Sequence, residues 1–174
     1  MAYLNEKASK RLLLTNARTT IQKRGLKPMK VREAMTPSPN CVRPNDPVQL
    51  AAQEMKLHNV GLLPVRDDGI LFGVITDRDI AIGCVATGNS PMECLVKDYM
   101  TANPITIGPE SDTDEAYELM GREQVRRLCV MEDGKLIGII SLGDLAVQAL
   151  DAQNLARTLA RISQPVRSGE PVIR

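Results

Sequence analysis

The stretch Gly73-Val74-Ile75-Thr76-Asp77-Arg78-Asp79 has a counterpart later in the chain, Gly138-Ile139-Ile140-Ser141-Leu142-Gly143-Asp144, which starts 65 residues further on. In both stretches apolar residues, most of them β-branched, follow a glycine, and this pattern predicts a buried strand. A Thr or Ser then precedes an Asp by three positions, which is typical of the first turn of a helix. We therefore expect a strand that runs directly into a helix at both places.

The two stretches lie at the ends of a longer internal duplication. Residues 31–80 align without a gap with residues 96–145, and sixteen of the fifty aligned positions are identical. A copy of this length is too short to bury one face of a sheet by itself. We therefore expect the two copies to pack against each other about a pseudo-twofold axis.

Each copy carries the same order of local signals. A Val-x-x-x-Met-Thr opening and a short extended run lead to Pro44 in the first copy and to Pro109 in the second. A helix pattern follows, then an apolar run, an Asp-Gly pair that predicts a hairpin turn, and a returning strand. Together with the helix after the repeated stretch, the order in each copy is β-α-β-β-α.

Capping residues mark where the first long helix of each copy is expected to begin. In the first copy, Asp46 followed by Pro47 and Gln49 fits a helix start with a capping box. In the second copy, Ser111 and Asp114 form the equivalent pair. The apolar residues that follow recur at helical spacing, which indicates a face that packs into a core.

This order of elements resembles the cystathionine-β-synthase (CBS) domain family, and two copies in tandem resemble its paired form, the Bateman module. The resemblance rests on the Met-Thr opening, the strand with its Asp-Gly hairpin, and the Gly-hydrophobic-hydrophobic-Thr/Ser-x-x-Asp ending, each present twice. It implies a mixed α/β (α+β) fold of two β-α-β-β-α repeats with extra N- and C-terminal helices. The expected parts are a basic helical arm (1–30), two repeats (31–95 and 96–150), and a C-terminal helix with a flexible tail (151–174).

The Thr76-x-x-Asp79 and Ser141-x-x-Asp144 turns admit two interpretations. Beside the free backbone N–H groups of a helix start, a hydroxyl and a carboxylate can hold a phosphate and a ribose diol. The same spacing also forms a capping box, which explains both residues without a ligand. The family resemblance favours the first interpretation, because it implies an adenosine derivative (AMP, ADP, ATP or S-adenosylmethionine) in the cleft between the repeats, with the Asp on the ribose.

Arginines distinguish the two clefts that this resemblance implies. Val125-Arg126-Arg127-Leu128 precedes a strand of the second repeat, where the first repeat has Val60-Gly61-Leu62-Leu63. The resemblance implies that a basic residue here reaches the phosphates of a nucleotide whose ribose is held by the other repeat. Guanidinium groups suit phosphate oxygens better than the other side chains of the chain. The alternative is that the arginine pair is a solvated flank of an edge strand.

Carried over residue by residue, the resemblance gives one charged cleft and one uncharged cleft. The residues that it places in the charged cleft are Thr76, Asp79, Arg126 and Arg127. Arg78, at the helix start, is a further candidate for this cleft, and the alternative is that it points to solvent. The residues expected in the other cleft are Ser141 and Asp144, which would face Gly61 and Leu62. No cofactor is expected to be required, and an adenine nucleotide is expected as a regulatory ligand.

Composition limits the possible functions. Aromatic residues are 2% of the chain, so it has no aromatic platform for stacking single-stranded nucleic acid. The single histidine, His58, is distant in sequence from the four cysteines, and no Cys-x-x-Cys spacing occurs, so no zinc site is expected. No apolar run approaches the roughly 20 residues of a membrane helix. We therefore expect a cytoplasmic protein without membrane insertion.

Charge is distributed unevenly along a chain whose net charge is +1. Residues 1–30 contain eight Lys or Arg and a single Glu, whereas residues 31–150 are acidic overall. The basic arm can lie on the chain's own acidic body, or it can bind a protein partner, a membrane surface or nucleic acid.

The last part of the chain predicts a long helix. Apolar and small residues hold helical spacing from Leu145 through Ile162, and Pro165 ends the pattern. Its alanines permit close approach by another helix, so we expect it to pack on the basic arm or on a second subunit. A homodimer is expected for this reason and because members of the resembled family pair their modules.

The sequence contains no supported catalytic set, with no Ser/His/Asp or Cys/His arrangement. We therefore expect a regulatory binding module and no enzyme activity. The alternatives are a nucleic-acid-binding protein that uses residues 1–30 and a regulatory subunit of a separate enzyme or transporter.

Overall fold

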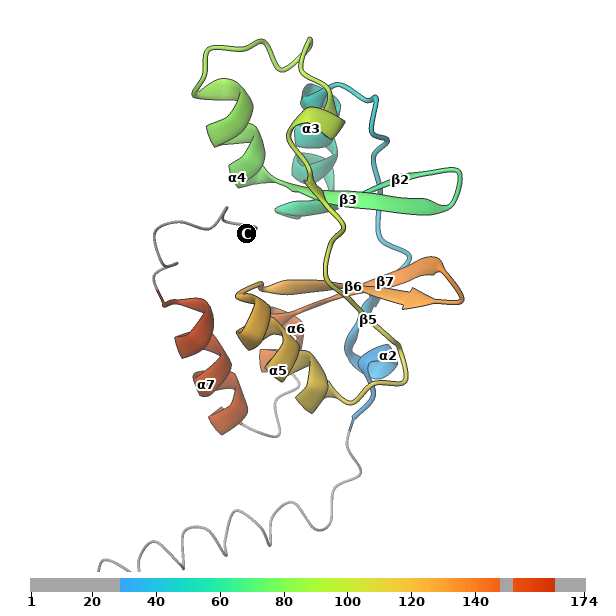
Figure 1. The fold of residues 1–174 in the computed structure, drawn as a ribbon, viewed down its shortest axis with the longest axis vertical. Helices are drawn as coiled ribbons and strands as arrows, with labels where there is room; N and C mark the ends of the chain where they lie inside the picture. Colours follow the sequence, from blue (N-terminus) through green and yellow to red (C-terminus); the bar gives the residue numbers. More distant parts are fainter. Residues whose placement is uncertain (1–28, 148–151, 165–174) are drawn as a thin grey trace, which may run out of the picture.

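The computed structural model describes residues 29–147 and 152–164. The chain forms two stacked halves, each with a small sheet facing the other half and helices on the outside (Figure 1). This is the mixed helix-and-strand fold that the sequence predicts. The sheets are formed by strands from both repeats, as the pairing below shows.

The first half contains the three-stranded sheet β2-β3-β4. Its strands are β2 (Leu62–Asp67), β3 (Ile70–Thr76) and β4 (Thr101–Ala102). Its helices are α3 (Val48–His58), the short α4 (Asp77–Asp79), which continues into the π-helical η1 (Ile80–Val85), and the 3₁₀ turn η2 (Val96–Asp98).

The second half contains the four-stranded sheet β1-β7-β6-β5. Its strands are β1 (Thr36–Pro37), β5 (Thr106–Ile107), β6 (Arg127–Glu132) and β7 (Lys135–Ser141). Its helices are α2 (Val31–Ala34), α5 (Thr113–Glu123), α6 (Leu142–Val147) and α7 (Ala152–Ile162).

Both predicted hairpins are present, and they match in detail. Asp68 and Gly69 turn the chain between β2 and β3 with φ angles of 46° and 83°, and Asp133 and Gly134 do so between β6 and β7 with 48° and 74°. Both pairs of strands are antiparallel and carry an irregularity at the equivalent position. The internal duplication of the sequence is therefore also a duplication of local structure.

The Met-Thr openings of the two repeats are exchanged between the sheets. β1, at the start of the first repeat, pairs with β7 of the second, and β4, at the start of the second repeat, pairs with β3 of the first. Gly73 and Gly138 leave room for these neighbouring strands to approach closely. A Cβ atom on Gly73 would lie 2.5 Å from the Thr101 carbonyl oxygen, and one on Gly138 would lie 2.5 Å from Met35 Sδ.

The hydrophobic cores follow the same exchange. Val31 and Ala34 of α2 are buried in the core of the second half, among residues of α5, β6, β7 and α6. Cys94 and Val96, which lead into the second repeat, are buried in the core of the first half. The two halves are thus interlocked. The segment that leads into the first repeat completes the core of the second half, and the segment that leads into the second repeat completes the core of the first half.

Both predicted helix caps are wrong. α3 begins at Val48, and the Asp46 carboxylate instead accepts a hydrogen bond of 2.7 Å from the Arg43 backbone N–H. α5 begins at Thr113 with Asp112 as its N-cap residue, and neither helix has a side-chain cap. The Asp112 carboxylate binds the Lys30 ammonium at 2.7 Å, which fastens the start of the first repeat to the second half.

The prediction of one continuous C-terminal helix is also wrong. The structure has two helices, α6 and α7, which contact each other and lie in different places (Figure 1). α7 packs mainly against α5 of its own chain, where Thr158 is buried and donates a hydrogen bond of 3.3 Å to the Tyr117 carbonyl. Arg161 adds an ion pair of 2.8 Å with Glu118. The predicted basic arm lies outside the described residues, except for its last two positions.

Candidate functional site

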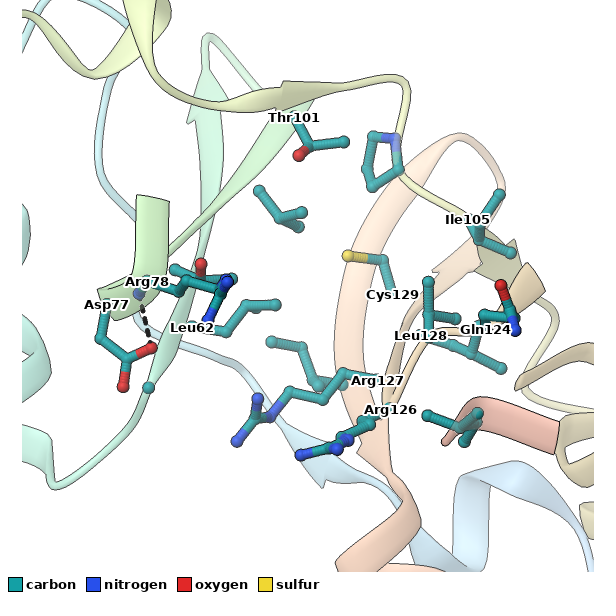
Figure 2. A pocket seen from close by; sticks show the side chains of 17 residues that line it. Leu62, Asp77, Arg78, Thr101, Ile105, Gln124, Arg126, Arg127, Leu128 and Cys129 are labelled. Atoms are coloured by element: carbon teal, nitrogen blue, oxygen red, sulfur yellow. Dashed lines mark hydrogen bonds between the residues drawn. The ribbon is translucent and has the colours of Figure 1, made fainter. Parts of the chain in front are cut away.

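A cavity of about 310 Å³ lies where the two halves meet. β2 and β6 begin at the same side of the molecule, and β3 and β7 end there, so residues of both repeats surround it. Figure 2 shows the side chains of its wall. They come from 61–78 and Thr101 of the first half, from 104–139 of the second half, and from Ile162 of α7.

Charged side chains line one part of the cavity. Arg126 and Arg127 come from the start of β6, and Asp77 and Arg78 come from α4 on the opposite wall (Figure 2). All four side chains are exposed to solvent. The lining contains three guanidinium groups and one carboxylate, so this part of the cavity favours an anion.

Apolar side chains line another part of the cavity. Leu62, Val74, Leu128 and Ile139 come from the two facing sheets. Cys129 also lines the cavity and points toward the first half (Figure 2), and burial raises the pKa of its thiol to about 12. The thiol is therefore neutral near pH 7 and acts as a small apolar group. The cavity as a whole suits a ligand with one apolar part and one anionic part.

The turn motif forms the capping box in both repeats. The Asp79 carboxylate oxygen Oδ2 accepts hydrogen bonds from the Thr76 backbone N–H at 2.8 Å and from its hydroxyl at 2.7 Å, and the Asp79 N–H donates to that hydroxyl at 3.1 Å. Ser141 and Asp144 repeat these contacts at 2.8, 2.7 and 3.1 Å. The interpretation that needs no ligand thus describes the unliganded turn, and it uses only Oδ2 of each Asp.

The structure brings together part of the predicted site. Thr76, Arg78, Arg126 and Arg127 line the same cavity, as expected for the charged cleft. Asp79, the residue expected to hold the ribose, is half-buried beside the cavity without lining it.

The residues of the predicted uncharged cleft are not brought together in this cavity. Ser141 and Asp144 do not line the cavity, whereas Gly61 and Leu62, which were expected to face them, do. Arg127 lies directly across from Ser141 in the β6–β7 pair, as Leu62 lies across from Thr76. The residues that lead into β2 and β6 line the same cavity, and the sequence alone does not show this long-range relation.

Three polar residues of the lining were not predicted from the sequence: Asp77, Gln124 and Thr101. Asp77 is the residue after Thr76, and its carboxylate comes so close to Gly61 that a Cβ there would lie 3.0 Å from Oδ2. Gln124 ends α5 in a left-handed conformation, and its Nε2 donates to the Arg161 carbonyl at 3.1 Å. The position of Asp77 in the first turn of a helix was a signal that the sequence contained. The contact of Gln124 with α7 is long-range, and the sequence contains no signal for it.

Residues 29–147 and 152–164 contain neither a cluster of metal ligands nor a membrane-spanning helix. In these ranges no group of three or more His, Cys, Asp or Glu side chains is placed to hold a metal ion. Every helix of the described ranges is too short or too polar to cross a membrane.

Comparison with known proteins gives the same assignment over most of the chain. A family model of the CBS domain matches residues 31–83 and 96–150. The CBS domain-containing protein YhcV of Bacillus subtilis is 38% identical over 133 residues, which are 76% of this chain and 94% of that protein.

Solved structures agree. The crystal structure of Hypoxic Response Protein I with two coordinated zinc ions has a TM-score of 0.64 and 30% identity, over 70% of this chain and 99% of that one. A CBS-domain protein from Agrobacterium tumefaciens has a TM-score of 0.64 and 29% identity, over 69% of this chain and 98% of that one.

The interlocked pair of repeats with a cavity between them defines a tandem-repeat module of the regulatory or sensory class. The chain belongs to the CBS domain family, with two copies of the domain.

Proposed function

We propose that the protein is a regulatory module that binds an adenosine-containing nucleotide, such as AMP, ADP, ATP or S-adenosylmethionine, in the cavity between its two CBS repeats. In this role it requires no cofactor and catalyses no reaction. The ligand is a signal, and the response is a change in how the two halves and α7 are arranged.

The observation that carries the proposal is the convergence of Arg126 and Arg127 from one repeat with Thr76 and Arg78 from the other around one cavity. Guanidinium groups bind phosphate oxygens with two parallel hydrogen bonds, which a lysine cannot do. The apolar wall beside them supplies a surface for a base. A nucleotide matches this combination of a flat, largely apolar ring and a phosphate.

Asp79 can bind a ribose because one oxygen of its carboxylate takes no part in the capping box. Oδ2 is occupied by the capping box, so Oδ1 is the atom that would accept from a ribose hydroxyl. Because Asp79 lies beside the cavity rather than in its wall, the proposal includes a small movement of the α4 turn toward the ligand. The free energy of binding would drive this movement.

α7 is placed to transmit the signal. Ile162 forms part of the cavity wall, and Gln124, also in the wall, holds the Arg161 carbonyl at the end of α7. A ligand that contacts both side chains therefore changes the free energy of α7 docking on α5. Coupling of about 1 to 3 kcal/mol is usual between such sites.

The first test is a thermal-shift screen of the purified protein with adenosine, AMP, ADP, ATP and S-adenosylmethionine. A ligand at 100 times its Kd stabilises the folded state by about 2.7 kcal/mol, which is easily measured. No shift with any of these compounds would contradict the proposal. Salt-sensitive retention on DNA or RNA that is lost without residues 1–30 would instead favour a nucleic-acid-binding function.

The second test concerns the signal. Hydrogen exchange is measured over residues 1–30 and 145–163 with and without a saturating nucleotide. We expect protection to change in α7 as well as around the cavity. A change confined to the cavity would mean that the protein stores a ligand without transmitting its presence, and the proposed switch would be wrong.

A further inference from the structure

Two buried cysteines meet inside the first half, away from the nucleotide cavity. Cys84 lies in η1 and Cys94 lies in the segment before η2, and their sulfur atoms are 2.8 Å apart. Cys84 is fully buried and Cys94 is 8% exposed. A short sideways movement of either side chain brings the two sulfurs to bonding distance, which is about 2.05 Å.

Hydrogen-bond donors converge on the sulfur of Cys94. The Cys84 thiol donates to Cys94 Sγ, and the Tyr99 hydroxyl lies 3.2 Å from the same atom. The Asn89 amide donates to the Tyr99 oxygen at 3.3 Å, which leaves the Tyr99 proton available for Cys94. These two contacts and its greater exposure make Cys94 the thiol of the pair that a reagent reaches first.

Cys84 has the opposite environment. Burial, followed by the hydrogen bond with Cys94, raises the pKa of its thiol to about 11, so it keeps its proton near pH 7. It is therefore the less reactive thiol toward a peroxide, and it remains to attack the partner sulfur once that sulfur is oxidised. The pair has the division of labour of an attacking thiol and a resolving thiol.

We propose that Cys84 and Cys94 are a redox-active dithiol that a hydroperoxide converts into an intrachain disulfide, with Cys94 reacting first. The Cys94 thiolate attacks one peroxide oxygen, the O–O bond breaks, and the leaving oxygen takes a proton and departs as water or an alcohol. Cys94 is then a sulfenic acid. The Cys84 sulfur attacks Cys94 Sγ, the S–O bond breaks, and the hydroxyl leaves with the Cys84 proton as a second water.

The disulfide would fasten two segments that both lead to the cavity. η1 continues from α4, which carries Asp77 and Arg78, and the Cys94 segment leads through η2 to β4, which carries Thr101. The stretch between the cysteines is exposed over residues 85–90, so oxidation closes a surface loop without crossing the core.

Trypsin offers a direct assay, because no Lys or Arg lies between Arg78 and Lys97 and both cysteines fall in one peptide, 79–97. The reduced, full-length protein is treated with hydrogen peroxide, denatured in the presence of iodoacetamide so that free thiols are alkylated, and digested with trypsin. We expect peptide 79–97 to be lighter than its dithiol form by about 2 Da and to carry no alkyl group. Recovery of this peptide with two alkyl groups would overturn the proposal.

Variants test the roles of the residues. Cys41→Ser, at a half-buried cysteine elsewhere, should leave the disulfide and its rate unchanged, whereas Cys94→Ser should leave Cys84 open to alkylation after denaturation. Tyr99→Phe removes a donor to Cys94, so disulfide formation should slow by about threefold or more. An unchanged rate in Tyr99→Phe would refute the assignment of Cys94 as the first thiol to react.

Discussion

Replacement of Gly73 by alanine tests the exchange of strands between the repeats. Gly73 lies in β3, at the position where β4 of the other repeat pairs with it. A Cβ atom at this position would lie 2.5 Å from the Thr101 carbonyl oxygen and 3.0 Å from Met100 Sδ. The oxygen belongs to the backbone, so it cannot move away as the end of a flexible side chain can.

The magnitude follows from this contact. Overpacking of a core by one methyl group costs about 1 to 3 kcal/mol. The displaced β4 would also weaken its backbone hydrogen bonds to β3, at about 1 kcal/mol for each bond. We therefore expect Gly73→Ala to lower the free energy of unfolding by about 2 to 4 kcal/mol. Gly138→Ala should cost less, because its shortest contact is with the flexible Met35 side chain.

Urea denaturation followed by circular dichroism measures these values. Gly108→Ala is the matched control, since the nearest atom to its added Cβ is Ser111 Oγ at 3.9 Å, and we expect a change within about 0.5 kcal/mol. If Gly73→Ala changes the free energy of unfolding no more than Gly108→Ala does, the close pairing of β3 with β4 is not as described. A larger loss of stability in Gly138→Ala than in Gly73→Ala would also contradict the backbone contact of Gly73 with Thr101.

Three further predictions concern the helix dock, pH and assembly. Gln124→Ala removes the amide that donates to the Arg161 and Gln164 carbonyls at and just beyond the end of α7. Hydrogen exchange in residues 158–164 should therefore become faster, while the exchange of α3 should stay the same. Because burial raises the pKa of Cys129 to about 12, the folded protein keeps a proton that the unfolded chain loses near pH 9. The free energy of unfolding should therefore fall between pH 9 and 12, at up to about 1.4 kcal/mol per pH unit from this thiol, and Cys129→Ala should fall less steeply. Sedimentation at micromolar concentration should show a homodimer, and a species of 19.1 kDa alone would count against it.

The sequence predicted local structure well and long-range partners poorly. The strands, the Asp-Gly hairpins and the duplication were predictable, because each depends on residues close together in the chain. The sequence also showed that Met35 and Gly138 carry family motifs, but not that one packs on the other. Periodicity identifies an apolar face without identifying the element that covers it, so the position of α7 on α5 was missed.

The candidate site illustrates the same limit. Arg126 and Arg127 were assigned to a cavity with Thr76 because the family resemblance supplied a long-range relation that the residues alone do not contain. The capping box was predictable from spacing, since it joins residues three apart. The place of Gln124 in the wall was not, because it depends on where α7 ends.

The nucleotide site is the central claim, and calorimetry with AMP and adenosine tests it most directly. The proteins compared are the unmodified chain, the double variant Arg126→Ala/Arg127→Ala, and Arg66→Ala, which removes an exposed arginine of β2 outside the cavity lining.

Each charge-assisted phosphate contact contributes about 1.5 to 3 kcal/mol, so the unmodified protein should bind AMP at least tenfold more tightly than adenosine. The double variant should lose this preference and Arg66→Ala should keep it. Equal preference for AMP in all three proteins would contradict the account, because the phosphate would then be bound elsewhere.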